Sequence, residues 1–229
     1  MRRQIKDLIN FIFPVECHIC HNPLASHEKF ICSHCLSHLP RTRYHSYPMN
    51  AMEQRLLALT PFKAATGHFF YSKDSDLAQV IQDMKYRGFH SLGKLLGEIA
   101  ARELCMSRFL DDIDLIIPVP MHFFKKCLRG YNQTDHIAKG ISKVTGLPVL
   151  NALQMTRYRK TQTSMNRHQR LLNAKNLFRV KKNIDLNYQN VLIVDDVCTT
   201  GATIGGAARA IYDKFPHAGL YLFTLGVTF

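Results

Sequence analysis

The sequence predicts an α/β protein in which a parallel sheet is flanked by helices and follows a small four-cysteine ribbon. Short apolar runs alternate with helical periodicities, and the clearest run, residues 191–194, ends in an acid pair followed by a Thr/Gly turn. Such alternation is typical of βαβ units and of a sheet covered on both faces. Two C-x-x-C pairs predict the ribbon. We expect residues 1–60 to form an N-terminal helix and the ribbon, and residues 61–229 to form the α/β domain.

The apolar spacing predicts the elements of the chain in order. The expected elements are a short helix ending at 56–59, a strand at 69–71, helices over 77–88 and 91–104, a strand at 114–120, a helix over 137–146, strands at 147–150, 177–180 and 191–194, a helix over 204–215, and a strand at 220–225. Gly88 and Gly146 follow two of these helices, as glycines that end helices do.

Composition and charge bound the function. The chain has 229 residues, of which 46% are hydrophobic and 21% charged, so it is long enough to bury a core and is not disordered. Its formal net charge is +13, and residues 121–182 hold fourteen Lys or Arg against one acid, Asp135, so 14 − 1 accounts for the whole excess. This segment favours anionic partners such as nucleic acid, nucleotide phosphate, pyrophosphate or an acidic membrane surface. The alternative is a solvated basic surface.

The N-terminal residues predict a short amphipathic helix rather than a membrane span. Residues 5–12 place apolar side chains on one helical face, and Pro14 ends the pattern. Lys6, Asp7 and Asn10 interrupt the apolar run, no cleavage site follows, and no stretch of about 18 apolar residues occurs. We therefore expect a cytoplasmic protein.

Four of the seven cysteines form two C-x-x-C pairs separated by eleven residues. Each pair places two thiolates on one side of a turn, and two pairs close the tetrahedral site that Zn2+ prefers. Disulfides are the alternative, in an oxidising compartment. Four thiolates leave no open coordination position, so we expect one structural zinc, with His18, His21 and His34 outside the ligand set. Cys105 and Cys127 are isolated and expected to be buried. The predicted zinc ligands are Cys17, Cys20, Cys32 and Cys35.

The acid pair after residues 191–194 predicts a ligand site. Asp195 and Asp196 follow the strand, and a Thr/Gly turn then leads into a helix. Ligands of open parallel sheets bind at this edge, and backbone N–H groups with threonine hydroxyls can hold a phosphate at a helix N-terminus. Carboxylates repel phosphate, so we expect them to face sugar hydroxyls. A simple helix cap and turn is the alternative.

Residues 191–203 resemble the phosphoribosyl-diphosphate (PRPP) motif of type I phosphoribosyltransferases, with residues 200–203 matching its loop. The resemblance implies a type I phosphoribosyltransferase-like fold, ribose contacts from the acid pair, and a 5′-phosphate held by residues 198–203. The implied PRPP-binding residues are Asp195, Asp196, Val197, Cys198, Thr199, Thr200, Gly201, Ala202 and Thr203. The implied pyrophosphate loop is Val119, Pro120, Met121 and His122.

The same resemblance implies that Mg2+ accompanies PRPP and that residues 157–173 correspond to a mobile loop closing over pyrophosphate. It points to no dedicated catalytic nucleophile, and it implies that any hood over the acceptor lies within residues 1–75. The basic residues expected to bind anions are Lys85, Arg87, Lys125, Lys126, Arg129, Arg157, Arg159, Lys160, Arg167 and Arg170.

The order of features along almost the whole chain resembles the ComF family. The features that carry this resemblance are the ribbon, residues 85–88, residues 117–120, residues 129–133 and the PRPP motif. It implies a role in competence, the uptake of DNA for natural transformation. Two functions stay open. One is a PRPP-binding protein that binds single-stranded DNA, an uptake motor or a recombination partner. The other is an active transferase that moves ribose-5-phosphate from PRPP to an unidentified nitrogen base and releases pyrophosphate.

The aromatic residues of the basic segment are candidates for stacking on single-stranded DNA. They are Phe123, Phe124, Tyr131 and Tyr158.

Overall fold

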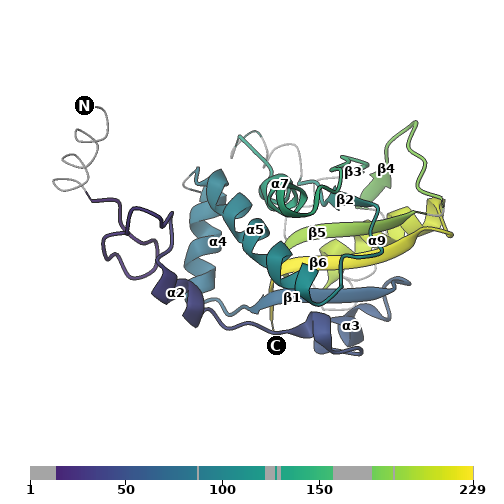
Figure 1. The fold of residues 1–229 in the computed structure, drawn as a ribbon. Helices are drawn as coiled ribbons and strands as arrows, with labels where there is room; N and C mark the ends of the chain where they lie inside the picture. Colours follow the sequence, from purple (N-terminus) through teal and green to yellow (C-terminus); the bar gives the residue numbers. More distant parts are fainter. Residues whose placement is uncertain are drawn as a thin grey trace, which may run out of the picture.

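A computed structural model describes residues 14–86, 88–121, 127, 130–156, 177–187 and 189–228. Within these residues the central sheet is entirely parallel, with the strand order β1-β6-β5-β2 (Figure 1). Its strands are β1 (Ala64–Phe70), β6 (Gly219–Val227), β5 (Asn190–Cys198) and β2 (Leu115–Pro118). Because all four run in one direction, their carboxyl ends meet at one edge of the sheet.

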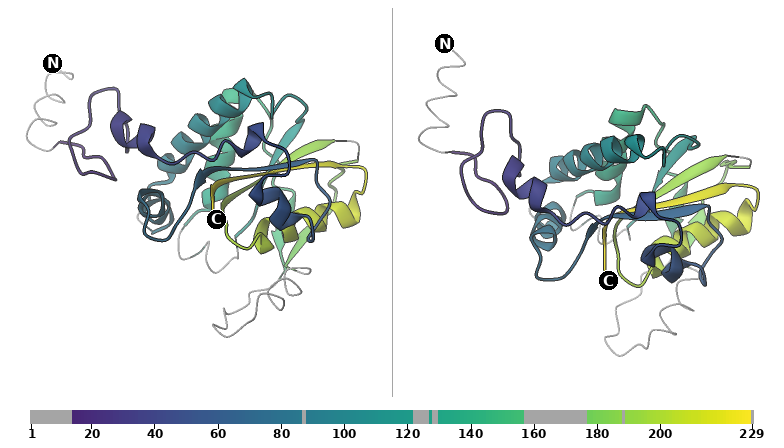
Figure 2. Two further views of the ribbon diagram at one scale, coloured as in Figure 1. Left: turned by 90° about the horizontal axis from the view of Figure 1, so that it is seen from below. Right: turned by 60° about the horizontal axis from the view of Figure 1, so that its bottom comes forward.

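Helices cover both faces of this sheet, which explains why its strands are mostly apolar and buried. The helices are α3 (Ala51–Leu56), α4 (Asp76–Tyr86), α5 (His90–Met106), α7 (Gln133–Thr145) and α9 (Ala202–Lys214). Val194 and Phe223 pack with α4, α5 and α7, whereas their neighbours Ile193 and Leu222 pack with α3 and α9. Figure 2 shows the dark-blue α3 beside the yellow-green α9 on the second face. The predicted fold class is confirmed.

Helices α5 and α7 approach each other at two glycines. A Cβ atom at Gly97 would lie 2.3 Å from the carbonyl oxygen of Ile137, and one at Gly140 would lie 2.2 Å from that of Lys94. Both distances are too short for any other residue without moving a backbone. The close contact holds α7 against α5 and so places the start of α7 beside the carboxyl end of β2.

The N-terminal third contains α2 (Ser33–His38) and the 3-10 helix η1 (Tyr44–Ser46). We call residues 15–39 the four-cysteine ribbon. It lies beside α4 (Figure 1), and Cys17, Ile31 and Leu39 join the core that α4 and α5 form. Residues 41–60 pack on the sheet instead: Arg41 forms a β-bridge with Phe69, and the Asn50 amide donates to the Ala65 carbonyl at 2.9 Å. The domain boundary at residue 60 stays a prediction.

The structure differs from the predicted elements at several points, among them the start of β1 at Ala64 and of α7 at Gln133. No strand forms at 147–150: Pro148 lacks an N–H donor, and Val149 makes only an isolated bridge with Ile116. A short strand that the sequence analysis missed, β3 (Leu153–Met155), pairs antiparallel with β4 (Phe178–Val180). Strand β5 continues through both aspartates to Cys198. The predicted helix over 5–12 lies outside the described residues, and none of the described helices has the length and apolarity to cross a bilayer.

Candidate functional site

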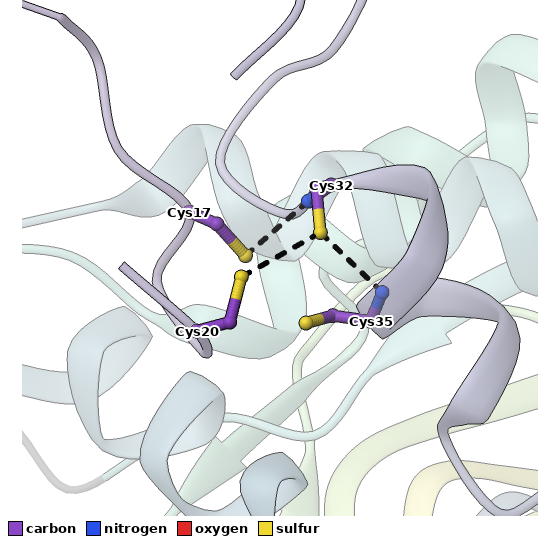
Figure 3. A group of neighbouring side chains, drawn as sticks. All are labelled: Cys17, Cys20, Cys32 and Cys35. Atoms are coloured by element: carbon purple, nitrogen blue, oxygen red, sulfur yellow. Dashed lines mark hydrogen bonds between the residues drawn. The ribbon is translucent and has the colours of Figure 1, made fainter. Parts of the chain in front are cut away.

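The four predicted metal ligands converge on one point of the ribbon (Figure 3). Their Sγ atoms all lie within 4.8 Å of one another, and Cys20 Sγ is 3.8 Å from Cys32 Sγ. A tetrahedron with Zn–S bonds of about 2.3 Å has edges of about 3.8 Å. The cluster therefore fits a tetrahedral metal ion such as Zn2+.

Backbone N–H groups surround these sulfurs. Cys17 Sγ accepts from the N–H groups of Ile19 at 3.4 Å and Cys32 at 3.3 Å, and Cys32 Sγ accepts from Cys35 at 3.4 Å. Burial raises the pKa of the Cys17 thiol, but hydrogen bonds from the backbones of Cys20, Cys32 and Ile19 outweigh it and lower the pKa to about 6. Burial raises the pKa of Cys35. The donors stabilise the thiolate charge that a bound metal requires.

His18 ties the ribbon to α4 rather than to the sulfur cluster. Its Nδ1 lies 2.7 Å from Asp83 Oδ2, and its carbonyl accepts from Gln79 Nε2 at 2.7 Å. Its ring also meets Phe89 edge-on, with centroids 4.4 Å apart. The ribbon is thus anchored along α4, and the Asp83 contact lies in the half of the helix that carries Lys85.

The acid pair lies inside β5, not after it as the apolar run predicts. Asp195 pairs in register with Thr224 of β6 and is only 7% exposed. Burial, and then the charge of Asp196, raise the pKa of Asp195 to about 7. Asp196 Oδ2 lies 2.6 Å from Lys85 Nζ. Two carboxyls and one ammonium group therefore form a compact charged cluster at the carboxyl edge of the sheet.

The loop after β5 is shaped by Gly201. This residue has φ +78° and caps the N-terminus of α9, and a Cβ atom there would lie 2.7 Å from Leu56 Cδ2. Ala202 N–H donates to Thr200 Oγ1 at 3.4 Å. The first-turn N–H groups of a helix have no acceptors within it, so the start of α9 presents donors toward this edge.

Arg55 of α3 holds the loop from behind, a role that the sequence analysis missed. Its guanidinium donates to the carbonyl oxygen of Thr199. It also donates to Oγ1 and to the carbonyl oxygen of Thr228, and both of these bonds are 2.9 Å long. Thr228 N–H donates to the Cys198 carbonyl at 3.0 Å. Leu59 packs on the other side, 2.8 Å from where a Cβ of Gly205 would lie. Residues 55–59 therefore form the wall of the loop, and no local pattern in the sequence marks them.

Replacing Arg55 should loosen this loop. Because Arg55→Ala removes three charge-assisted hydrogen bonds, we expect the free energy of unfolding to fall by about 1–3 kcal/mol and the amides of residues 199–202 to exchange faster. Thermal unfolding and hydrogen exchange measure both effects. Arg102→Ala, on the exposed side of α5, is the matched control. Unchanged exchange at residues 199–202 would contradict the assignment of Arg55.

The predicted pyrophosphate loop begins at the same edge. Val119 N–H donates to the Val194 carbonyl at 2.9 Å, and the Val119 carbonyl accepts from Asn132 Nδ2 at 3.1 Å and Thr134 Oγ1 at 2.6 Å. Pro120 and Met121 follow, both half-buried. The start of α7 thus holds the end of β2 beside β5, and Asn132 and Thr134 are positioning residues that the sequence analysis had not singled out individually.

Several predicted site residues lie outside the described part of the chain. Lys85 is the member of the predicted anion-binding set that the structure describes. Outside the described residues lie His122 of the predicted pyrophosphate loop and the rest of the anion-binding set: Arg87, Lys125, Lys126, Arg129, Arg157, Arg159, Lys160, Arg167 and Arg170. The stacking candidates Phe123, Phe124 and Tyr158 are also outside it.

The remaining cysteines differ from one another. Cys105 and Cys127 are exposed, so the prediction that they are buried is wrong. Cys198 is buried at the end of β5, and burial raises the pKa of its thiol to about 11. That thiol therefore stays protonated at neutral pH and is unsuited to be a nucleophile.

A parallel sheet with helices on both faces, an acid pair at its carboxyl edge and a following helix N-terminus define a phosphoribosyltransferase-like α/β protein, here with a metal-binding ribbon. No protein-family model matches the chain. Competence protein F of Haemophilus influenzae is 30% identical over 186 residues, which cover 79% of this chain and 77% of that relative. The chain therefore belongs to the ComF family.

Two further similarities extend this comparison. DNA utilization protein YhgH of Escherichia coli K12 is 25% identical over 221 residues, covering 86% of this chain and 91% of that protein. Among solved structures, adenine phosphoribosyltransferase from Saccharomyces cerevisiae is 17% identical with a TM-score of 0.36, covering 77% of this chain and 88% of that chain. At this TM-score the likeness transfers neither a ligand nor an activity.

Proposed function

We propose that the chain binds PRPP together with Mg2+ at the carboxyl edge of its sheet and acts in DNA uptake. The observation that carries this proposal is the order of groups along one edge: the acid pair of β5, then the Gly201 turn, then the N-terminus of α9. A phosphate fits the helix N-terminus, and the carboxyls beside it suit ribose hydroxyls, which donate hydrogen bonds.

The cationic groups suit the second half of the ligand. Lys85 Nζ lies 2.6 Å from Asp196 Oδ2, and Val119 at the end of β2 bonds to Val194 of β5 at the same edge, so a pyrophosphate on a ribose bound there would have a positive charge within reach. Pyrophosphate oxygens are the hard ligands that Mg2+ prefers, so the ion would arrive with PRPP. We expect the basic residues outside the described part of the chain to add counter-charge there.

The alternative function is transfer. In that reaction the bond from the ribose anomeric carbon to pyrophosphate breaks, a bond to a nitrogen base forms, and the base loses a proton. The transition state would resemble an oxocarbenium ion, which Asp195 and Asp196 would stabilise, and Lys85 with a bound Mg2+ would offset the charge of the leaving pyrophosphate. This reaction needs no protein nucleophile. PRPP binding is common to both functions, because transfer also begins with bound PRPP.

The cellular role rests on the named relatives. One of these relatives is called a competence protein and the other a DNA utilization protein, which supports a role in DNA uptake. We infer that the basic segment 121–182 and the ribbon bind single-stranded DNA, or an uptake motor or recombination partner, on the cytoplasmic side of the membrane.

Calorimetric titration of the full chain with PRPP and Mg2+ tests the ligand. We expect saturable binding of one PRPP per chain and weaker binding of ribose 5-phosphate, which lacks the pyrophosphate that Lys85 and Mg2+ would hold. The titration should weaken when Mg2+ is left out. No saturable heat with PRPP would overturn the proposal, and pyrophosphate release on adding purines or pyrimidines would identify the transferase.

Salt dependence tests the DNA proposal. Affinity for an oligodeoxythymidylate should fall linearly on a log–log plot against salt, because each neutralised phosphate releases counterions. Replacing Lys125, Lys126 and Arg129 with alanine should weaken binding by about tenfold and flatten the slope, whereas replacing Arg2 and Arg3 should not. Equal effects of the two sets would mean that the segment is only a solvated surface.

A further inference from the structure

We propose that His90, Tyr131 and His136 form a stacking platform for a nucleobase beside the acid pair. The proposal deepens the proposed function and rests on it, because it places a base next to the site proposed for the phosphoribosyl group. We call these three rings the ring platform. If the three rings only packed α5 against α7, they would be expected to be buried.

Two of the rings come from helices α5 and α7 and the third, Tyr131, lies just before α7, and all three contact one another. The His90 and Tyr131 centroids are 4.9 Å apart at 76°, those of Tyr131 and His136 are 5.5 Å apart at 89°, and those of His90 and His136 are 5.2 Å apart at 31°. His90 begins α5 and is exposed, while the other two are half-buried. The cluster is thus braced by packing yet open to solvent on one side, as a binding surface must be.

Hydrogen bonds place the platform next to the acid pair. The Tyr131 hydroxyl donates to the carbonyl oxygen of Met84, and the next residue, Lys85, reaches Asp196 Oδ2 at 2.6 Å. Asn132, adjacent to Tyr131, donates to the Val119 carbonyl at the end of β2. The same short segment therefore connects the platform to both sides of the proposed ribose site.

The surroundings of the rings fit an aromatic ligand that carries phosphate. Lys94 and Lys139 are exposed near His136, and Asp135 is the acid beside it. Burial, then the charges of Lys139 and His90, lower the pKa of His136, so its imidazole is neutral at neutral pH. A neutral imidazole offers one donor and one acceptor to a base edge while its face stacks. Every nucleobase has such a face, whether it belongs to a mononucleotide or to single-stranded DNA.

Fluorescence of 2-aminopurine, which is quenched when the base stacks, tests the platform. The two probes are 2-aminopurine riboside 5′-monophosphate and an oligodeoxythymidylate with one internal 2-aminopurine. We expect the wild type to quench at least one probe, and His90→Ala to weaken that binding by about tenfold, the contribution of one stacked base. His90→Phe keeps a ring and should retain binding. His217→Ala, an exposed histidine just before β6 at the opposite edge, is the control.

The two probes separate the sources of the base. Quenching of the monophosphate alone assigns the platform to a mononucleotide, and quenching of the oligonucleotide alone assigns it to single-stranded DNA. If neither probe is quenched, or if His90→Ala binds as tightly as the wild type, the platform is overturned. A parallel PRPP titration of the wild type distinguishes failure of the platform from failure of the proposed function. PRPP binding without quenching would overturn the platform only.

Discussion

The Asp195→Asn variant is expected to be more stable than the wild type at pH 8 and yet to lose PRPP binding. Burial and the charge of Asp196 raise the pKa of Asp195 from 3.8 to about 7 in the folded chain. The folded state thus binds this proton more tightly than the unfolded state, so stability falls as pH rises between these two values. Asparagine does not ionise and escapes this loss.

The stability gain should therefore depend on pH. At pH 8 we expect the variant to exceed the wild type by on the order of 2 kcal/mol, and the difference should shrink as pH falls toward 4. In the wild type the Asp196 N–H donates to Asp195 Oδ1 at 2.9 Å, and asparagine keeps an Oδ1 acceptor for this bond. Thermal unfolding at pH 5 and pH 8 measures the difference.

Binding should change in the opposite direction. A neutral amide is a weaker acceptor for ribose hydroxyls than a carboxylate and supplies no charge to an oxocarbenium-like centre, so we expect PRPP affinity to fall by at least about tenfold. Asp213→Asn is the control, since Asp213 is an exposed partner of Arg209 on α9. A variant that is less stable at pH 8, or that binds PRPP as the wild type does, would contradict the role of Asp195.

The acid pair is expected to lower stability and to favour PRPP binding, and this explains the position of Lys85. Two adjacent carboxyls at a buried strand end are unfavourable for folding, and the ammonium group 2.6 Å from Asp196 offsets part of that cost. Such unfavourable groups are retained at functional sites, where a ligand uses them. The resemblance placed Lys85 among anion-binding residues, and the structure adds that it neutralises the acid pair.

The sequence predicted the parts of this site whose chemistry is local. The C-x-x-C spacing is enough to predict the sulfur cluster, because each pair is closed by one turn. The unit from residue 191 to residue 203 was also predicted, since strand, acids, turn and helix follow one another directly. The end of the strand was not predicted correctly. The apolar run stops at Val194, but β5 continues to pair with β6 as far as Cys198, opposite Val227.

The missed parts depend on contacts between distant residues. Arg55 reaches Thr199 and Thr228 from far along the chain, and nothing in its own short helix distinguishes it from a solvated arginine. The failed strand at 147–150 has a similar origin, because its apolar residues are suited to a strand while Pro148 limits its pairing to one bridge. Periodicity reports which side of an element is buried, not which partner covers it.

Removing the metal from the ribbon should unfold it and loosen the end of α4. We expect the purified chain to contain about one zinc, and Cys20→Ser to lower that content well below one. Four thiolates and few apolar residues hold residues 15–39, so metal binding supplies most of the free energy that folds them. Elemental analysis and hydrogen exchange measure metal content and the protection of the ribbon.

The effect should reach the acid pair through His18. Because His18 lies next to Cys17 and is bonded to Asp83, loss of the ribbon frees the part of α4 that carries Lys85, and PRPP affinity should fall several-fold although β5 and β6 stay protected. Cys105→Ser, which replaces an exposed cysteine of α5, should change neither metal content nor exchange. A ribbon that stays protected without metal would show that its packing on α4 alone suffices to fold it.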